Sequence, residues 1–326
     1  MRALRAVEER WPTAGAFVIA RGARTEAQVV VVEIDEAGDR GRGEAAPYAR
    51  YDESVTGVLD QIEGVRGYIE AGADRQALQR LLPAGAARNA IDCALWDLEA
   101  KQSGVRAWAL AGLPRLDPVK TAYTLSLGSP AAMGEAAAAA ARRPMLKIKL
   151  GGDGDLERVE AVRQAAPRTR LIVDANEALS MEQLGRLLPA LAAMDVKLIE
   201  QPLPAGQDQA LEGFDSPIPL CADESLHTRA ELDLCARRYA CANIKLDKAG
   251  GLTEALALKA AAQARGMMVM AGSMVATSLA MAPALLIAQG ADFVDLDGPL
   301  LLAQDRRPGL SIVGSAIEPP SPELWG

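Results

Sequence analysis

The chain has 326 residues, of which half are hydrophobic, and it carries a formal net charge of −8 at pH 7. This length suits two domains or one barrel with additions, and it is enough to bury a sizeable core. The acidic balance and the lack of any basic run argue against a nucleic-acid partner, because a phosphate backbone requires a basic protein face.

The sequence also predicts a cytoplasmic protein that has no membrane segment. The N-terminus is charged where a signal peptide needs an apolar core. The longest apolar stretch, 275–288, is interrupted by Thr277, Ser278 and Pro283, and it is too short to span a bilayer, so we expect a buried barrel helix there. The four cysteines show no C-x-x-C pairing, and we expect reduced thiols.

Residues 1–115 predict a separate α+β domain. A β-branched run at 28–34 follows a shorter candidate strand at 4–8 and a loop at 20–25, and a small antiparallel sheet fits this pattern. Strands that come before helices, rather than alternating with them, are typical of an α+β domain. The predicted helices lie at 55–71 and 84–102.

From Val119 onward the pattern alternates between strands and helices. Parallel strands that are buried on both faces are short and uniformly apolar, as these runs are. Eight such strands predict a closed barrel. The predicted strands are 119–126, 145–150, 170–174, 197–201, 218–223, 242–246, 267–271 and 292–296. The predicted helices include 130–143, 156–166, 181–194, 229–238, 253–265 and 278–289.

Charged residues end successive predicted strands at nearly constant intervals of 22 to 26 residues, followed by one longer interval of 50. A strand, a helix and two loops take about that many residues. The pattern therefore predicts one charged group at the carboxyl end of each strand, where barrel enzymes place their chemistry. These residues are Lys149, Asp174, Glu200, Asp223, Lys245 and Asp295.

Three of these groups predict a metal site. Asp174, Glu200 and Asp223 would lie on neighbouring strand ends and point into one mouth. Three such carboxylates would raise one another's pKa values unless a cation lay among them. Hard oxygen ligands in this number suit Mg²⁺. The alternative is three independent carboxylates that stabilise helix N-termini.

The lysines predict acid–base chemistry. Lys147 and Lys149 alternate with Ile148, so both should point the same way, and we expect like charge and a metal to lower their pKa values. Lys245 should lie across the mouth from Lys149. A substrate carboxylate on the metal would then place its α-carbon between two bases, which predicts a 1,1-proton transfer through an enediolate. Solvated lysines on an edge strand are the alternative.

The chain resembles the enolase superfamily, and specifically its muconate-lactonising subgroup. In that subgroup the second acid/base is a lysine on the sixth strand, which matches Lys245, whereas Lys248 falls past the strand end. The resemblance covers the whole chain. The matching motifs are K-I-K at 147–149, D-A-N-E at 174–177, E-Q-P at 200–202, A-D-E-S at 222–225 and N-I-K-L-D-K-A-G-G at 243–251.

This resemblance implies an α/β fold with a modified TIM barrel, (β/α)7β, and an N-terminal α+β capping domain that the C-terminal tail completes. The implied limits are 1–115 for the capping domain, 116–298 for the catalytic barrel and 299–326 for the tail that returns to the cap. The resemblance also implies Mg²⁺ as the cofactor.

A further motif concerns the substrate. D-L-D-G-P at 295–299 is similar to the signature of dipeptide epimerases, in which Asp295 and Asp297 would hold the α-ammonium group of the substrate. Two turn-forming aspartates are the alternative. Members that epimerise L-Ala-D/L-Glu need a cation for the glutamate side chain, and Arg24 is our candidate, with Arg21 as its rival. Other positions that match substrate contacts are Thr124, Lys147, Ser273 and Met274.

Together these features predict an isomerase that epimerises the murein dipeptide L-Ala-D/L-Glu. The alternatives are another dipeptide epimerase, an N-acylamino acid racemase, or an o-succinylbenzoate synthase or cycloisomerase, whose substrates lack an ammonium group for Asp295 and Asp297. A binding protein without activity would tolerate the loss of a ligand or lysine, and none is lost. We expect a small-molecule dipeptide partner, and the sequence leaves open whether the chain forms a homo-oligomer.

Overall fold

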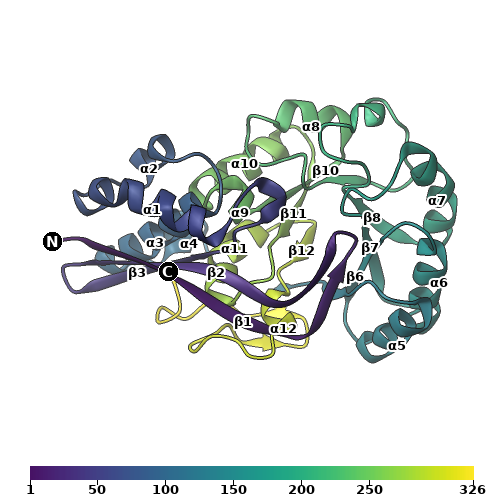
Figure 1. Cartoon of the computed structure of the whole chain (residues 1–326), viewed down its shortest axis with the longest axis horizontal. Coiled ribbons are helices and arrows are strands. Elements are labelled where there is room, and N and C mark those ends of the chain that lie inside the picture. Colours follow the sequence, from purple (N-terminus) through teal and green to yellow (C-terminus); the bar gives the residue numbers. More distant parts are fainter.

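The N-terminal part of the computed structural model, which describes residues 1–326, is built on a long β-hairpin. Strand β1 (Ala3–Ile19) pairs antiparallel with β2 (Gly22–Glu36), and β3 (Asp39–Ala45) pairs with the other edge of β2. The register of β1 on β2 shifts after Pro12. Beyond this shift the hairpin continues as a two-stranded arm, which we call the hairpin arm and which reaches over one end of the barrel (Figure 1).

The observed hairpin differs from the prediction, which placed a strand at 4–8 and a loop at 20–25. The first strand is much longer, and residues 22–25 belong to β2, so only the turn at Ala20 and Arg21 remains of the loop. Side chains of the arm are exposed or half-buried along most of its length. The alternation of apolar and polar residues that marks a half-buried strand is therefore missing from its sequence.

Helices cover one face of the N-terminal sheet, and the side chains of Ser54 and Asp74 cap the first two. The third helix approaches β3 so closely that a Cβ at Gly41 or Gly43 would lie 2.1 Å from one of its carbonyl oxygens. Both positions therefore require glycine. The elements of this part are η1 (Ala49–Tyr51), α1 (Val55–Glu70), α2 (Arg75–Leu81), α3 (Ala86–Ser103) and α4 (Ala107–Leu110).

Eight parallel strands form the C-terminal sheet in sequential order. The two end strands meet where Ala122 N donates to Val294 O (2.8 Å) and Leu296 N donates to Thr121 Oγ1 (2.8 Å), and these bonds close the barrel. The predicted modified TIM barrel is confirmed. Its strands are β5 (Tyr123–Leu125), β6 (Met145–Lys149), β7 (Arg170–Asp174), β8 (Val196–Glu200), β9 (Leu220–Ala222), β10 (Cys241–Lys245), β11 (Met268–Gly272) and β12 (Phe293–Asp295).

Helices surround the barrel in every crossover except one. Between β8 and β9 the chain forms only the 3-10 helix η2 (Gln209–Leu211), and a short helix, α9 (Leu246–Ala249), directly follows β10. The helix predicted at 229–238 begins later, at Leu232. The main crossover helices are α5 (Pro130–Ala140), α6 (Asp155–Ala165), α7 (Met181–Ala193), α8 (Leu232–Arg238), α10 (Leu252–Ala264) and α11 (Ser278–Ala288).

The apolar stretch at 275–288 contains α11, every residue of which is buried. The side chain of Thr277 caps this helix by accepting a hydrogen bond from Leu279 N. The stretch is therefore a core helix of the barrel, as predicted. None of the helices combines the length and the hydropathy that a membrane span requires.

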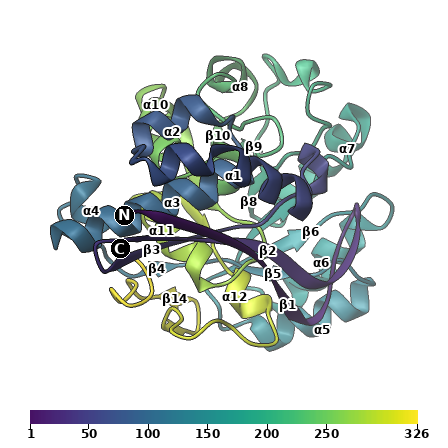
Figure 2. The same cartoon turned by 60° about the vertical axis from the view of Figure 1, so that its left-hand side comes forward.

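The C-terminal tail contacts both parts of the molecule. After α12 (Gly298–Leu301), strands β13 (Ile312–Val313) and β14 (Ala316–Ile317) form a small sheet with β4 (Val119–Lys120), so the predicted strand at 119–126 is split in two. The chain then ends beside β3 (Figure 2), where the side chain of the penultimate residue donates to a carbonyl of α3. The tail completes the N-terminal part, whereas the limits between domains remain predictions.

Candidate active site

The barrel mouth and the hairpin arm enclose a cavity of about 180 Å³, which we call the substrate cavity. Every predicted site residue lines it except Asp174 and Glu200, which are fully buried behind Lys147 and Lys149. Residues from seven separate segments therefore meet in one place. The lining residues among those predicted are Arg24, Thr124, Lys147, Lys149, Asp223, Lys245, Ser273, Met274, Asp295 and Asp297.

Strand register places the first three charged strand ends side by side. Lys149 pairs with Asp174 across β6 and β7, and Asp174 pairs with Glu200 across β7 and β8. Lys147 and Lys149 both reach the barrel interior, whereas Ile148 between them packs in the main hydrophobic core. This is the alternation that the K-I-K motif predicts.

Lys147 is the centre of the buried charge network. Its Nζ lies 2.7 Å from Glu200 Oε2, 2.7 Å from Asp295 Oδ2 and 3.1 Å from Asp174 Oδ2. Lys149 shares Asp174, at 2.7 Å from the same oxygen. One ammonium group thus links two of the predicted metal ligands to the first acid of the D-L-D motif.

The two predicted bases bind different carboxylates. Lys149 Nζ lies 2.7 Å from Asp174 Oδ2, and Lys245 Nζ lies 2.7 Å from Asp223 Oδ2. Both lysines line the substrate cavity and both are nearly buried. They therefore approach the cavity from separate sides of the carboxylate set.

Burial opposes the positive charge of Lys147 and Lys245, but the carboxylates around them outweigh burial and hold both pKa values above the usual lysine range. The expectation that like charge and a metal lower the lysine pKa is wrong for Lys147 in this structure, because carboxylates lie at hydrogen-bonding distance from its ammonium group. The pKa of these lysines would fall only if the carboxylates were bound to another group instead.

The three carboxylates also titrate unequally. Burial and the neighbouring Asp174 raise the pKa of Glu200 to about 8. Burial opposes ionisation of Asp174 and Asp223 as well, but Lys149 and Lys147 beside Asp174, and Lys245 and Lys248 beside Asp223, lower the pKa of each below its usual range. A net rise is therefore found only at Glu200, because two lysine ammonium groups lie beside each of the other two acids and lower their pKa values.

No three His, Cys, Asp or Glu side chains have the spacing of a metal-ligand set, because lysine ammonium groups lie between the carboxylates. The donor chemistry nevertheless fits a hard cation. Glu200 Oε2 is buried and accepts no hydrogen bond, although Lys147 Nζ is 2.7 Å away, while Asn243 Nδ2 holds the other oxygen at 2.8 Å. Buried carboxylate oxygens that pair with ammonium groups are what a hard cation such as Mg²⁺ would bind.

Asp295 and Asp297 form a second acidic group in the substrate cavity, which Lys147 joins to the first. Asp297 Oδ2 accepts from Thr124 N (2.6 Å), and Asp295 Oδ1 is buried without a hydrogen-bond partner. Burial and the charge of Asp295 raise the pKa of Asp297 to about 7. Neither result suits two turn-forming aspartates, and the Asp297 side chain does not cap α12. The pair is arranged to accept a cation.

The two arginines of the hairpin arm have different environments. Arg21 donates to Tyr48 Oη (2.8 Å), Glu224 Oε1 (2.8 Å) and Glu177 Oε2 (3.0 Å), so its guanidinium is held by protein acceptors. Arg24 stacks over the Tyr48 ring at 5.0 Å, and its guanidinium makes no hydrogen bond to the protein. Of the two, Arg24 is the free cation that faces the substrate cavity.

The residues that connect these groups were not predicted from the sequence as site residues. Asn176 and Glu177 both have positive φ angles (45° and 71°), which non-glycine residues seldom adopt. Asp174 Oδ1 accepts from Asn176 N (2.9 Å), and Glu177 also binds Arg50 at 2.7 Å. Their position in the sequence could have indicated them, because Glu177 and Glu224 lie within the D-A-N-E and A-D-E-S motifs, which also contain predicted metal ligands.

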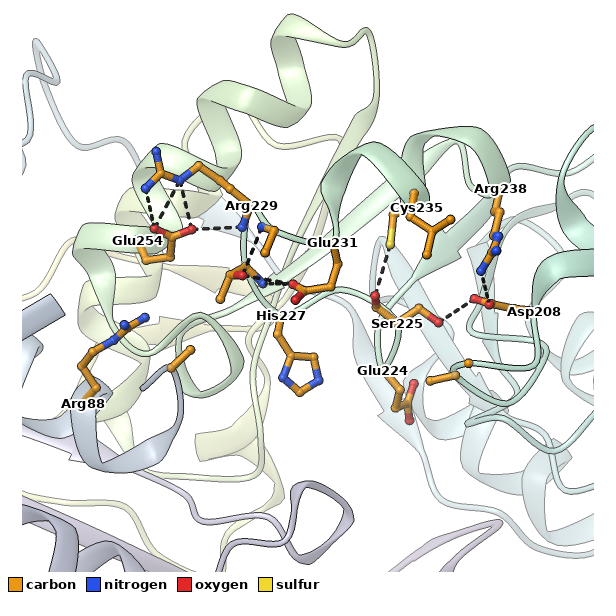
Figure 3. Close-up of a pocket in the computed structure, with 16 residues that line it drawn as sticks. Arg88, Asp208, Glu224, Ser225, His227, Arg229, Glu231, Cys235, Arg238 and Glu254 are labelled. Carbon is orange, nitrogen blue, oxygen red and sulfur yellow. Dashed lines mark hydrogen bonds and ion pairs between the residues drawn. The ribbon is translucent and has the colours of Figure 1, made fainter. Parts of the chain in front are cut away.

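A larger cavity of about 880 Å³ lies outside the mouth (Figure 3). Its polar groups pair with one another, as in Arg229 with Glu254 and Arg238 with Asp208, both drawn in Figure 3. His227 lines it, and burial lowers the pKa of this histidine to about 4. The cavity contains none of the predicted site residues.

Two family models together match most of the chain. The mandelate racemase/muconate lactonizing enzyme N-terminal domain matches residues 1–112, and the enolase C-terminal domain-like model matches residues 132–312. Among curated proteins, the L-Ala-D/L-Glu epimerase of Escherichia coli K12 is 48% identical over 95% of this chain and 97% of its own. An N-acetyl-D-glutamate racemase of Pseudoalteromonas sp. is 45% identical over 91% and 95%.

Solved structures agree. An enolase family member from Agrobacterium tumefaciens with homology to dipeptide epimerases, which contains sodium and L-Ala-L-Glu, is 51% identical over the full length of both chains, with a TM-score of 0.98. A dipeptide epimerase from Enterococcus faecalis, in complex with Mg and L-Leu-L-Tyr, is 26% identical over 98% of this chain and 97% of its own, with a TM-score of 0.90. The chain belongs to the mandelate racemase and muconate lactonizing enzyme family of the enolase superfamily, among its dipeptide epimerases, which are isomerases.

Proposed function

We propose that this protein is a Mg²⁺-dependent epimerase of L-Ala-D/L-Glu that acts on cell-wall dipeptide in the cytoplasm. The observation that carries the proposal is the set of charges that line the substrate cavity. Asp295, whose Oδ1 is buried without a hydrogen-bond partner, and Asp297 line it together with Lys149, Lys245 and the unpaired Arg24. A dipeptide with an acidic side chain offers an ammonium group and two carboxylates that complement these charges.

Asp295 and Asp297 bind the α-ammonium group in this scheme. Its charge would satisfy the buried Asp295 Oδ1 and lower the pKa of Asp297. Arg24 binds the glutamate side-chain carboxylate, because it is the guanidinium of the hairpin arm without a protein acceptor. These contacts orient the C-terminal residue of the dipeptide within the barrel mouth.

Asp174, Glu200 and Asp223 would hold Mg²⁺, which supplies stabilisation of negative charge on the substrate carboxylate. With a cation on Asp223, this carboxylate would stabilise the charge of Lys245 less, and the raised pKa of Lys245 would fall toward the range of a usable base. Lys149 and Lys245 then exchange protons with opposite faces of the α-carbon. One removes the α-proton and the other delivers a proton to the other face.

Isotope exchange tests the proposal. L-Ala-L-Glu incubated with the protein and Mg²⁺ in D₂O is expected to gain deuterium at the glutamate α-carbon as L-Ala-D-Glu forms, as measured by NMR and mass spectrometry. Omission of Mg²⁺ with a chelator is the control and is expected to stop exchange. If neither L-Ala-L-Glu nor any other dipeptide tried gained deuterium, the assignment as a dipeptide epimerase would be contradicted.

An N-acylamino acid racemase is the second candidate, because the relative from Pseudoalteromonas sp. is nearly as similar as the one from E. coli. An N-acetyl group has no positive charge, so it would offer Asp295 and Asp297 no cation in addition to Lys147. Asp297→Asn is therefore expected to lower kcat/KM for L-Ala-L-Glu by about tenfold or more, the value of one charge-assisted hydrogen bond. If kcat/KM for N-acetyl-glutamate exceeds that for the dipeptide in the wild type, the second candidate is favoured.

A further inference from the structure

Lys248 belongs to the buried charge network, but the two-base scheme does not use it. It lies in α9, three residues after Lys245, and only 1% of its surface is exposed. Its Nζ donates to Asp223 Oδ1 (2.7 Å), to the carbonyl oxygen of Asp223 and to the carbonyl oxygen of Asn243 (3.0 Å). An ammonium group has three N–H donors, so these three acceptors use all of them.

Lys248 approaches Asp223 from the side away from the substrate. Lys245 and Asp223 line the substrate cavity, whereas Lys248 lines a separate cavity of about 370 Å³ together with Tyr51 and His227. The two lysines therefore bind different oxygens of one carboxylate, with Lys245 on Oδ2 and Lys248 on Oδ1. From this position Lys248 does not reach a substrate α-carbon.

Lys248 joins the backbone of β9 to that of β10 beyond their ladder. Strands β9 and β10 pair only at Cys221 with Cys241 and at Ala222 with Ala242, and the ladder ends before Asp223. Beyond that point Lys248 donates to the carbonyl oxygens of Asp223 and Asn243, and the Asp223 carbonyl also accepts from Leu226 N (3.1 Å). Lys248 thus links the two chain segments where the chain turns to place a predicted metal ligand.

Hydrogen bonds with Gln201 and Lys248 therefore hold three of the four polar atoms of Asp223. Its backbone N–H donates to Gln201 Oε1 (2.8 Å), and Lys248 holds both its carbonyl oxygen and Oδ1. Only Oδ2, which Lys245 contacts, remains on the cavity side.

We propose that Lys248 is a positioning residue that fixes the Asp223 carboxylate so that Oδ2 is presented to the metal. The inference rests on the proposed function, because it concerns the metal site described there. Residues that orient a metal ligand typically contribute 10- to 100-fold to metal affinity. A purely electrostatic role has the opposite sign, since removal of a cation beside a metal ligand would strengthen Mg²⁺ binding.

The test is the Mg²⁺ affinity of Lys248→Met, measured by calorimetry without substrate. We expect the dissociation constant to rise about 10- to 100-fold over the wild type, with kcat at saturating Mg²⁺ reduced much less. Lys245→Met is the matched control, because it removes the ammonium group from the other oxygen of the same carboxylate. It is expected to bind Mg²⁺ at least as tightly as the wild type, and to lose kcat by about 10² to 10⁴ at every Mg²⁺ concentration.

Unchanged or tighter Mg²⁺ binding by Lys248→Met would overturn the assignment. So would a loss of kcat as large as in Lys245→Met at unchanged affinity, because that result would make Lys248 a chemical participant. If Lys248→Met does not fold, as judged by circular dichroism, Lys248→Gln is the second variant, because its two N–H donors leave at least one of the three acceptors without a partner. It is expected to bind Mg²⁺ more weakly than the wild type, and tighter binding contradicts the proposal. A wild-type protein that binds no Mg²⁺ would contradict the proposed function itself, and this inference with it.

Discussion

Arg21 at the tip of the hairpin arm donates to Glu224 Oε1 at 2.8 Å, and Glu224 directly follows Asp223. Arg21 also binds Glu177, three residues after Asp174, at 3.0 Å. The arm that covers the substrate cavity is thus attached to the two loops that carry predicted metal ligands. One guanidinium therefore links the arm to both of these loops.

Replacement of Arg21 by Gln is expected to weaken the binding of all dipeptides alike. It removes two charge-assisted bonds that hold the arm closed, each of which is worth about 1.5–3 kcal/mol. The expected result is a rise in KM of about tenfold or more for both L-Ala-L-Glu and the neutral L-Ala-L-Gln, with faster tryptic cleavage at Arg24. A KM increase confined to L-Ala-L-Glu would show that Arg21 binds the substrate side chain instead.

Replacement of Arg24 by Gln is expected to change the preference between substrates. Its guanidinium is free of protein acceptors, so we expect it to contact the glutamate carboxylate. The variant should lose about 10²-fold in kcat/KM for L-Ala-L-Glu, equivalent to about 2.7 kcal/mol of a charged contact. L-Ala-L-Gln is the matched substrate, and an equal loss for both dipeptides would contradict the assignment.

The barrel and its mouth could be predicted from the sequence because both leave local signals. Each of Lys149, Asp174 and Glu200 ends a short apolar run, and the spacing between runs reports the strand–helix unit. Alternation in K-I-K indicated the direction of both lysines. Such signals depend only on residues that are close in the chain.

Other features could not be predicted, because they depend on residues far apart in the sequence. Arg21 meets Glu177 and Glu224 across more than 150 positions, and nothing local marks the contact. The direction of the Lys245 pKa shift depends on its 2.7 Å distance to Asp223, which a sequence does not contain. The hairpin arm was missed because its exposed strands lack alternation.

Gly272 on β11 is expected to be essential for the position of Asn243. A Cβ at Gly272 would lie 2.3 Å from Asn243 Oδ1, and the amide of Asn243 holds Glu200 at 2.8 Å. Gly272→Ala should therefore destabilise the fold by about 1–3 kcal/mol through overpacking and weaken Mg²⁺ binding. Urea unfolding and calorimetry measure the two effects, and a variant that resembles the wild type in both would show that Asn243 does not orient Glu200.

Asp92 is expected to make the protein less stable as the pH rises from about 4 to 6. Burial raises the pKa of this carboxyl to about 6, although Thr253 stabilises its charge. In this range the unfolded chain loses the Asp92 proton first, so it binds fewer protons than the folded chain, and unfolding becomes easier. The loss is about 3 kcal/mol for this group alone.

Asp92→Asn removes this titration and keeps an oxygen for Thr253 N, which Asp92 binds at 2.9 Å. The free energy of unfolding, measured in urea at several pH values, should fall less steeply between pH 4 and 6 than in the wild type. Parallel curves for the two proteins would mean that Asp92 ionises normally in the folded state.

The central claim is that Lys149 and Lys245 act on opposite faces of one α-carbon. The most direct test follows deuterium exchange by Lys149→Ala and Lys245→Ala in D₂O, starting from L-Ala-L-Glu and from L-Ala-D-Glu in separate experiments. Each variant should lose epimerisation, and any exchange that remains should come from one epimer, a different one for each variant. Full turnover by both variants, or exchange of the same epimer by both, would contradict the two-base account.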